Sequence, residues 1–318
     1  MRFPIVASLC IMVINLVGCE QVALMSTPPK QAKASKDKLA IQAKHHFWNS
    51  LHHGRYQDIP RVSYLLTAAY LENPDDSQLA AYLGFTHIWK ITERSRVHDQ
   101  SPLITNEIIL SKKYFLDALE LDPHNPIYQG FYGDTQLIEG QIYQDKQEEV
   151  RGYFTLKKAI HEWPQFNYFT AGYPMSSLPA DSDHFKEGLT WQWKTLDLCT
   201  GTKINRKNPD YQPFMNKEIR TGQQRACWNS TIAPHNFEGF FMNMGDMLIK
   251  SGDVETGTII YKNAKLSKTY SLWPYKEMLE QRILNARENA VNFNKISSPP
   301  GKDILFNSGY GCVICHQK

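Results

Sequence analysis

Apolar residues recur at spacings of three and four positions along most of the chain, from about Asp37 to Phe293. This period matches one face of an α-helix, whereas a half-buried β-strand would alternate apolar and polar positions. Alternating runs of β-branched residues are scarce in the same stretch. The pattern therefore predicts an all-α fold that begins near residue 37 and ends near residue 293.

Several of these helical segments end in the same way. A large apolar residue is followed by an alanine three positions later and by a proline five positions after the alanine. The three sets are Leu66, Ala69 and Pro74; Phe115, Ala118 and Pro123; and Leu156, Ala159 and Pro164. A fourth set, with Thr269 where the others have proline, is Phe241, Met244, Gly245, Leu248, Gly252, Gly257, Tyr261 and Ala264. The shared frame indicates an internal repeat.

This frame resembles the tetratricopeptide repeat (TPR), whose unit is a pair of helices. The resemblance implies that the small residue lets the paired helices approach closely and that the proline ends the second helix. It also implies that Gly140 and Tyr143 take the family's places in the first helix of the third unit. The alanines lie farther apart than a unit of about 34 residues allows. Lengthened loops are therefore expected between paired helices, for instance near residues 95–105.

The chain divides by composition into several parts. Residues 19–36 are small, polar and basic, and predict a flexible tether without a core of its own. TPR-like helices are expected over 37–164 and 233–294. The stretch 165–232 does not fit the repeat, so it is expected to be a long irregular insertion packed against the helices. Residues 295–318 begin with a Pro-rich linker and end in a short tail.

The amino terminus carries an export pattern. The charged start at Arg2 precedes an apolar stretch over residues 3–17, which is too short to span a bilayer comfortably. It ends in Leu16-Val17-Gly18-Cys19, which resembles the lipobox of bacterial lipoproteins. The resemblance implies that residues 1–18 are removed and that Cys19 is lipidated. The alternatives are a plain signal peptide and a buried helix.

The residue after that cysteine adds a location to this expectation. It is Glu20 rather than the aspartate that often retains such lipoproteins in the inner membrane. The resemblance therefore favours the outer membrane, with the protein facing the periplasm. The lipid anchor makes the membrane one expected partner.

Composition limits which classes of molecule are expected as other partners. Hydrophobic residues make up 42% and charged residues 21% of the chain, as in soluble globular proteins. The net charge of +3 is carried without a basic block, so nucleic acid is not an expected partner. A protein partner is expected instead. The sequence motifs of hydrolases, phosphate loops and dinucleotide sites are absent, and the chain is not expected to be an enzyme.

Export also changes the interpretation of the cysteines. Of the six, Cys10 leaves with the signal and Cys19 carries lipid. The others would lie in an oxidising compartment, where pairing is expected. Because Cys312 and Cys315 form a motif of their own, Cys199 and Cys227 are the expected disulfide. The alternative is two separate buried thiols.

The last residues include Cys312-Val313-Ile314-Cys315-His316, the attachment signature of c-type haem. Two thiols at this spacing add to the two vinyl groups of the porphyrin, and the following histidine ligates the iron. The flanking sequence resembles the start of a class I cytochrome c. By that resemblance Cys312 and Cys315 form the thioethers and His316 is the proximal ligand. A cytochrome domain continues well beyond this motif, whereas only Gln317 and Lys318 follow here.

Three interpretations of this motif stay open: a covalent haem, a Cys312–Cys315 disulfide, and the remnant of a truncated cytochrome. His235, Met242 and Met247 are candidates for a distal ligand by residue type alone. Two functions follow. The first is a membrane-anchored lipoprotein scaffold with a c-type haem for electron transfer. The second is a TPR scaffold for protein binding without a cofactor. Two other clusters are not expected to form functional sites. Asp181, Asp183 and His184 are expected in a surface loop, and Trp191 and Trp193 are expected to pack in the core.

Overall fold

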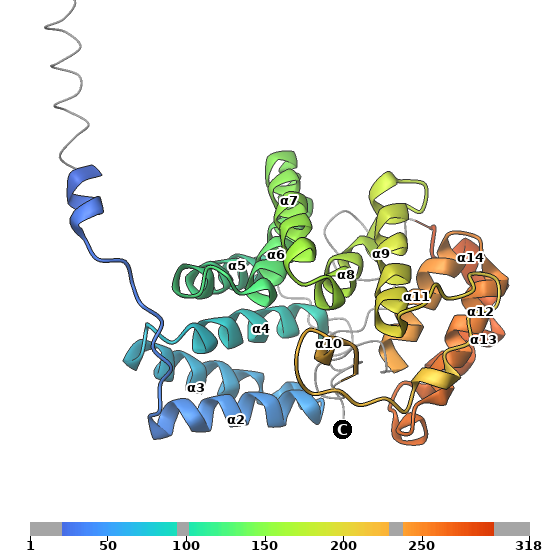
Figure 1. The fold of residues 1–318 in the computed structure, drawn as a ribbon, viewed down its shortest axis with the longest axis horizontal. Coiled ribbons are helices and arrows are strands. Elements are labelled where there is room, and N and C mark those ends of the chain that lie inside the picture. The colour runs from blue at the N-terminus through green and yellow to red at the C-terminus, as the bar shows by residue number, and fades with distance from the viewer. Residues whose placement is uncertain (1–20, 94–101, 229–237, 296–318) are drawn as a thin grey trace, which may run out of the picture.

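The structure is a computed structural model that describes residues 21–93, 102–228 and 238–295. In these ranges helices are the main regular structure and there is no β-strand, which confirms the predicted all-α class (Figure 1). The first long helix begins at Lys38, and the last helix, which is short, ends at Asn292. Each limit is one residue from the one expected from the periodicity.

The long helices pair in hairpins that follow one another along the molecule (Figure 1). The pairs are α2 (Lys38–His52) with α3 (Ile59–Glu72), α4 (Ser77–Glu93) with α5 (Ile104–Leu121), α6 (Pro126–Tyr143) with α7 (Lys146–Glu162), α8 (Pro164–Gly172) with α9 (Asp183–Thr200), and α11 (Glu238–Lys250) with α12 (Val254–Asn263). The short helices α13 (Lys276–Leu284) and α14 (Ala286–Asn292) pack against α11 and α12 at the end of the array.

Local sequence sets where these helices start and stop. Asn125 caps α6 by accepting hydrogen bonds from the amides of Ile127 and Tyr128, and Asp145 caps α7 in the same way. Pro74, Pro123 and Pro164 each follow the last residue of a helix by two positions. A proline disfavours helical geometry in the residue before it, which explains these endings.

The repeat frame forms the contacts between paired helices. Its apolar and alanine positions are fully buried: Leu66, Ala69, Phe115, Ala118, Leu156, Ala159, Tyr261 and Ala264 are each 0% exposed. Two glycines bring the paired helices together. A Cβ atom on Gly84 would lie 2.8 Å from the ring of Phe115, and one on Gly245 would lie 2.2 Å from the ring of Tyr261.

In the third hairpin two glycines of α6 approach α7. A Cβ on Gly133 would lie 3.0 Å from Leu156, the residue that corresponds to Phe115 and Tyr261, and one on Gly140 would lie 2.7 Å from the Glu149 amide nitrogen. Gly140 lies two helical turns later, beside Glu149 near the turn between α6 and α7, and Tyr143 is 50% exposed. Because α6 and α7 are 18 and 17 residues long, they stay in contact over the two turns between Gly133 and Gly140.

The expected irregular insertion at 165–232 is irregular only in part. Its first portion is the α8–α9 hairpin, which extends the stack of helices. Residues 201–224 contain no α-helix and lead to the short α10 (Arg225–Trp228). The helical period of α9 is hidden in the sequence because polar residues share its buried face. Gln192 and Thr195 are both 0% exposed.

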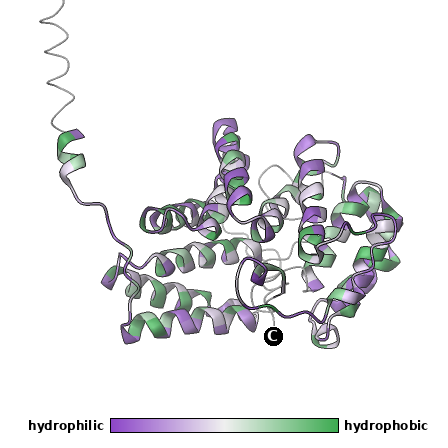
Figure 2. Ribbon diagram, in the orientation of Figure 1, coloured by the Kyte–Doolittle hydropathy of each residue, from purple (hydrophilic) through white to green (hydrophobic). Residues whose placement is uncertain are grey.

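The part of the tether that the structure describes is a short helical segment at 21–26 followed by a stretch without secondary structure up to residue 37. The stretch is tied to the array at its end. The Lys33 amide donates to the carbonyl of Asp75, and the Ser35 amide donates to the carboxylate of Asp76. In Figure 2 the long helices carry both hydrophobic and hydrophilic residues. Within the described ranges no helix is long and apolar enough to cross a membrane.

Candidate functional site

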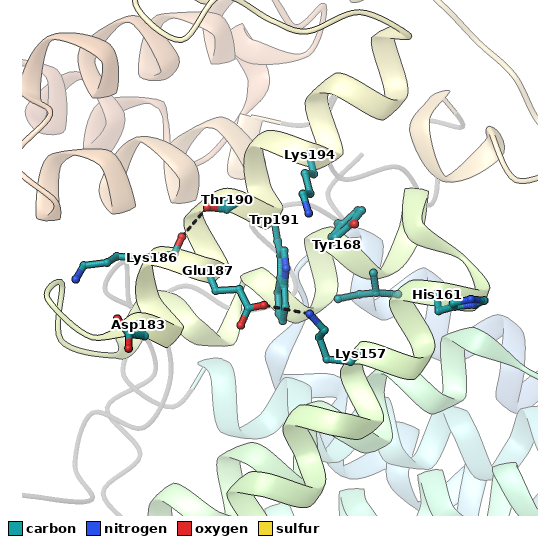
Figure 3. Close-up of a pocket in the computed structure, with 10 residues that line it drawn as sticks. Lys157, His161, Tyr168, Asp183, Lys186, Glu187, Thr190, Trp191 and Lys194 are labelled. Atoms are coloured by element: carbon teal, nitrogen blue, oxygen red, sulfur yellow. Dashed lines mark hydrogen bonds and ion pairs between the residues drawn. The ribbon is translucent and has the colours of Figure 1, made fainter.

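A surface pocket of about 730 Å³ lies where α7, α8 and α9 meet (Figure 3). We call it the α7–α9 pocket. Lys157 and His161 come from α7 and are one helical turn apart, while Lys186, Thr190 and Lys194 follow one another at single turns along α9. Residues four apart lie on the same face of a helix. Each helix therefore contributes a row of polar side chains to the pocket.

The polar residues of α9 keep their positions because both ends of that helix are well defined. Ser182 caps the start by accepting a hydrogen bond from the amide of Phe185, at 3.2 Å. Gly201 ends it in the left-handed conformation, at φ 72°, which favours glycine. Between these ends, Phe185 and Leu196 are 0% exposed and hold the opposite face of α9 against the array. The polar row is thereby directed to the surface.

The floor of the pocket is aromatic and aliphatic. Trp191 of α9 is 2% exposed, and it belongs to a buried cluster that includes Leu156 and Met175. Tyr168 of α8 and Ile160 of α7 complete the floor. The expected packing role of Trp191 therefore agrees with its burial, but the same ring also borders the pocket.

Lysine ammonium groups reach this floor from two helices. The Lys157 Nζ atom lies 5.6 Å from the centre of the Trp191 ring, and the Lys194 Nζ atom lies 5.2 Å from that of Tyr168. Both distances are within the range of a cation–π contact. Figure 3 shows Lys194 beside Tyr168 and Lys157 near Trp191, with the two lysines reaching into the pocket from different helices.

Only one of these lysines has an acidic neighbour. Lys157 pairs with Glu187 at 3.2 Å, and the Tyr153 hydroxyl donates to the same carboxylate at 2.8 Å. Burial lowers the pKa of Lys157, but the hydrogen bond and charge of Glu187 outweigh it and hold that pKa above its ordinary value. In the part of the chain that the structure describes, neither Lys186 nor Lys194 forms an ion pair.

The residues of the expected haem and lipid sites are not among those that the structure describes. Cys19, Cys312, Cys315 and His316 fall outside the described residues, as does His235. Met242 and Met247 are on α11 and are each 0% exposed. A haem iron could reach either sulfur only if the side chains packed around α11 moved, so the distal-ligand assignment stays a prediction.

The structure joins Cys199, at the end of α9, to Cys227, in α10, by a disulfide with a Cα–Cα distance of 5.3 Å. The segment between them also contacts the α7–α8 junction. The Trp163 Nε1 group donates to the carbonyl of Gln223 at 3.0 Å, and the Arg225 guanidinium lies 4.1 Å from the centre of the Trp163 ring. The disulfide thus fastens the irregular part of the insertion to the helical array.

Replacing both Cys199 and Cys227 by serine is expected to lower the free energy of unfolding by about 3–4 kcal/mol. The bond closes a loop of 28 residues, and the entropy of that loop is regained by the unfolded chain when the bond is absent. Urea unfolding of the exported protein measures the change. A double variant as stable as the parent protein would contradict this expectation.

No family model matches the chain, and neither a curated protein nor a solved structure matches it. Among the described residues there is also no group of three or more His, Cys, Asp or Glu side chains placed to hold a metal ion.

Sequence reasoning missed this pocket. Asp183 was assigned to a surface loop, whereas it is the first residue of α9 and borders the pocket. The four-residue spacing of Lys186, Thr190 and Lys194 was a usable sign of one polar helix face. Lys157 faces these residues across the pocket because α7 packs beside α8 and α9. No short stretch of sequence contains that information.

Proposed function

We propose that the protein is a lipid-anchored scaffold of the cell envelope, related to the TPR proteins, that binds a protein partner and carries a c-type haem on its tail. The observation that supports the scaffold most directly is the series of five stacked helical hairpins in the described residues. Stacked hairpins present long continuous surfaces, which repeat proteins use to bind other proteins. The frame of Phe115 and Ala118, repeated in the other hairpins, supports the TPR relationship.

The anchor follows from the sequence before the array. Cys19 ends a lipobox-like segment, and about two or three acyl chains at that residue would hold the protein on a membrane stably. Residues 20–36 would then separate the array from the lipid surface. Glu20 supports an outer-membrane location that faces the periplasm.

The haem is proposed because of one specific observation, the Cys312-x-x-Cys315-His316 motif in a chain with an export signal. Cys312 and Cys315 would hold the porphyrin by thioether bonds and His316 would ligate the iron. A haem bound there would supply one-electron transfer. The protein-binding scaffold without a cofactor stays the alternative, with the motif as a disulfide or a remnant.

One experiment tests both terminal groups. The full-length protein is produced with the cytochrome c maturation proteins in cells fed radioactive palmitate, and a denaturing gel is read for label and for haem stain. We expect both signals in the same band, because both attachments are covalent. Cys19→Ala should remove the label alone, and the Cys312→Ala/Cys315→Ala pair should remove the stain alone.

The Cys199→Ser/Cys227→Ser variant is the matched control, since it removes two cysteines and should keep both signals. Label without stain would reject the haem and leave the cofactor-free scaffold. Stain without label would reject the lipid anchor. Neither result depends on the α7–α9 pocket.

A further inference from the structure

We infer that the α7–α9 pocket binds an acidic segment of a protein partner, with a carboxylate on the lysines and an aromatic or aliphatic side chain on the floor. This inference rests on the proposed scaffold function and names where the partner docks and what it is made of. Three properties of the pocket support it: its charges, its floor and its shape.

The charges favour a carboxylate. Lys157, Lys186 and Lys194 border the pocket, and of these only Lys157 is paired with an acidic side chain in the described ranges. Lys194 is exposed overall, and its ammonium lies 5.2 Å from the centre of the Tyr168 ring at the edge of the pocket. An ammonium group forms strong charge-assisted hydrogen bonds with carboxylates. A ligand carboxylate would therefore supply the partner that Lys194 lacks.

The floor favours an apolar side chain next to that carboxylate. Beneath the lysines the partly exposed Tyr168 ring is accessible, while Trp191 and Ile160 border the pocket at 2% and 7% exposure. The apolar surface also continues outside the pocket. Phe154 is 66% exposed, Val150, one turn earlier on α7, is 55% exposed, and the Phe154 ring lies 5.4 Å from that of Tyr153. Exposed apolar groups gathered beside a charged pocket are typical of protein-binding surfaces.

The shape of the pocket favours a peptide over a membrane, and its acidic end limits where the carboxylate lies. Asp183 and Glu187 lie one turn apart at the start of α9 and would repel a carboxylate at that end, so the acidic side chain of a peptide is expected at the other end, beside Lys194. A flat bilayer cannot enter a recess, whereas an extended chain can. Free phosphate fits poorly as well, because the lining contains no arginine, the residue that suits bidentate phosphate binding.

The test uses the detergent-solubilised full-length protein and a fluorescein-labelled peptide in which Glu and Phe alternate. Fluorescence anisotropy should show saturable binding that weakens as salt is added, because part of the attraction is between charges. Lys194→Gln and Lys157→Gln are each expected to raise Kd about tenfold, the equivalent of about 1.4 kcal/mol. A peptide with Gln in place of Glu should bind far more weakly.

Lys158→Gln is the matched control. Lys158 is the next residue on α7, it lies 4.0 Å from Glu162, and it does not line the pocket. Its Kd should equal that of the parent protein. Circular dichroism confirms that each variant is folded, which is expected because all three lysines are exposed.

Three results would overturn the inference. The first is no saturable binding of the peptide. The second is an equal effect of Lys158→Gln and Lys194→Gln, which would show that binding responds to net charge alone. The third is seen with the unlipidated Cys19→Ser chain, if it floats with phosphatidylglycerol vesicles in a Lys194-dependent way but does not bind the peptide. The palmitate and haem readouts of the same preparation are independent of all three results.

Discussion

Replacing Arg282 by methionine is expected to lower the free energy of unfolding by about 3–5 kcal/mol at neutral pH. The Arg282 Nε atom lies 3.1 Å from Oδ1 of Asp246, whose side chain is 0% exposed. The Tyr261 hydroxyl donates to the same oxygen at 2.6 Å. Without the guanidinium, the carboxylate of α11 would stay buried with its countercharge removed. Such an uncompensated charge is among the largest single costs in a protein core.

The size of this loss should depend on pH. Burial raises the pKa of Asp246, although Arg282 and Tyr261 lower it. Because the folded pKa is above the unfolded value, the contribution of Asp246 is most favourable below the unfolded pKa and is lost as the pH rises through the folded pKa. Removing Arg282 raises the folded pKa further. The difference between the variant and the parent protein should therefore be larger at neutral than at acidic pH.

Urea unfolding at the two pH values measures both effects. Arg287→Met on α14 is the matched control, since this arginine is exposed and its loss should change stability by less than about 0.5 kcal/mol. The double variant Asp246→Leu/Arg282→Met should recover most of the loss, because it leaves no charge buried. A loss for Arg282→Met that is the same at both pH values would contradict the role assigned to Asp246.

Replacing Gly245 by alanine is expected to cost about 3 kcal/mol, the upper part of the usual range for overpacking. The new Cβ would lie 2.2 Å from the ring of Tyr261, far inside contact distance. The ring cannot move aside easily, because it is fully buried and its hydroxyl is bonded to Asp246. The α11–α12 hairpin would have to separate, and thermal unfolding should show a lower Tm.

Gly257→Ala, in the partner helix, is the comparison. Its Cβ would meet mainly Cδ1 of Ile249, at 2.9 Å, and the end of an isoleucine side chain can rotate away. The expected cost is about 1 kcal/mol. If the two substitutions cost the same, the close approach of Gly245 to Tyr261 is not what limits the hairpin.

Much of the fold could be predicted because its signals are local. The apolar period predicted helices between residues 37 and 293, and the prolines predicted where α3, α5 and α7 end. The repeat frame predicted buried contacts at positions such as Phe115 and Ala118, which are 0% exposed. Each of these depends on residues within one or two helical turns.

The features that the sequence did not predict concern residues whose neighbours are distant in sequence. The repeat frame did not select Gly133, which the structure places opposite Leu156. Met242 was selected as a possible iron ligand by residue type alone, and the structure shows it fully buried in the core. The type and spacing of residues do not show which face of a helix is covered by neighbouring helices.

By itself the sequence determined the helical class, the limits of the array, and the chemistry expected at Cys19 and at Cys312-x-x-Cys315-His316, because these are written in short stretches of chain. Only the tertiary structure decided that α8 and α9 form one more hairpin of the array. It also decided that Lys157 and Lys194 meet over one aromatic floor. The physical reason is that such juxtapositions arise when side chains from separate helices fill a shared volume, and that volume exists only after the helices have packed.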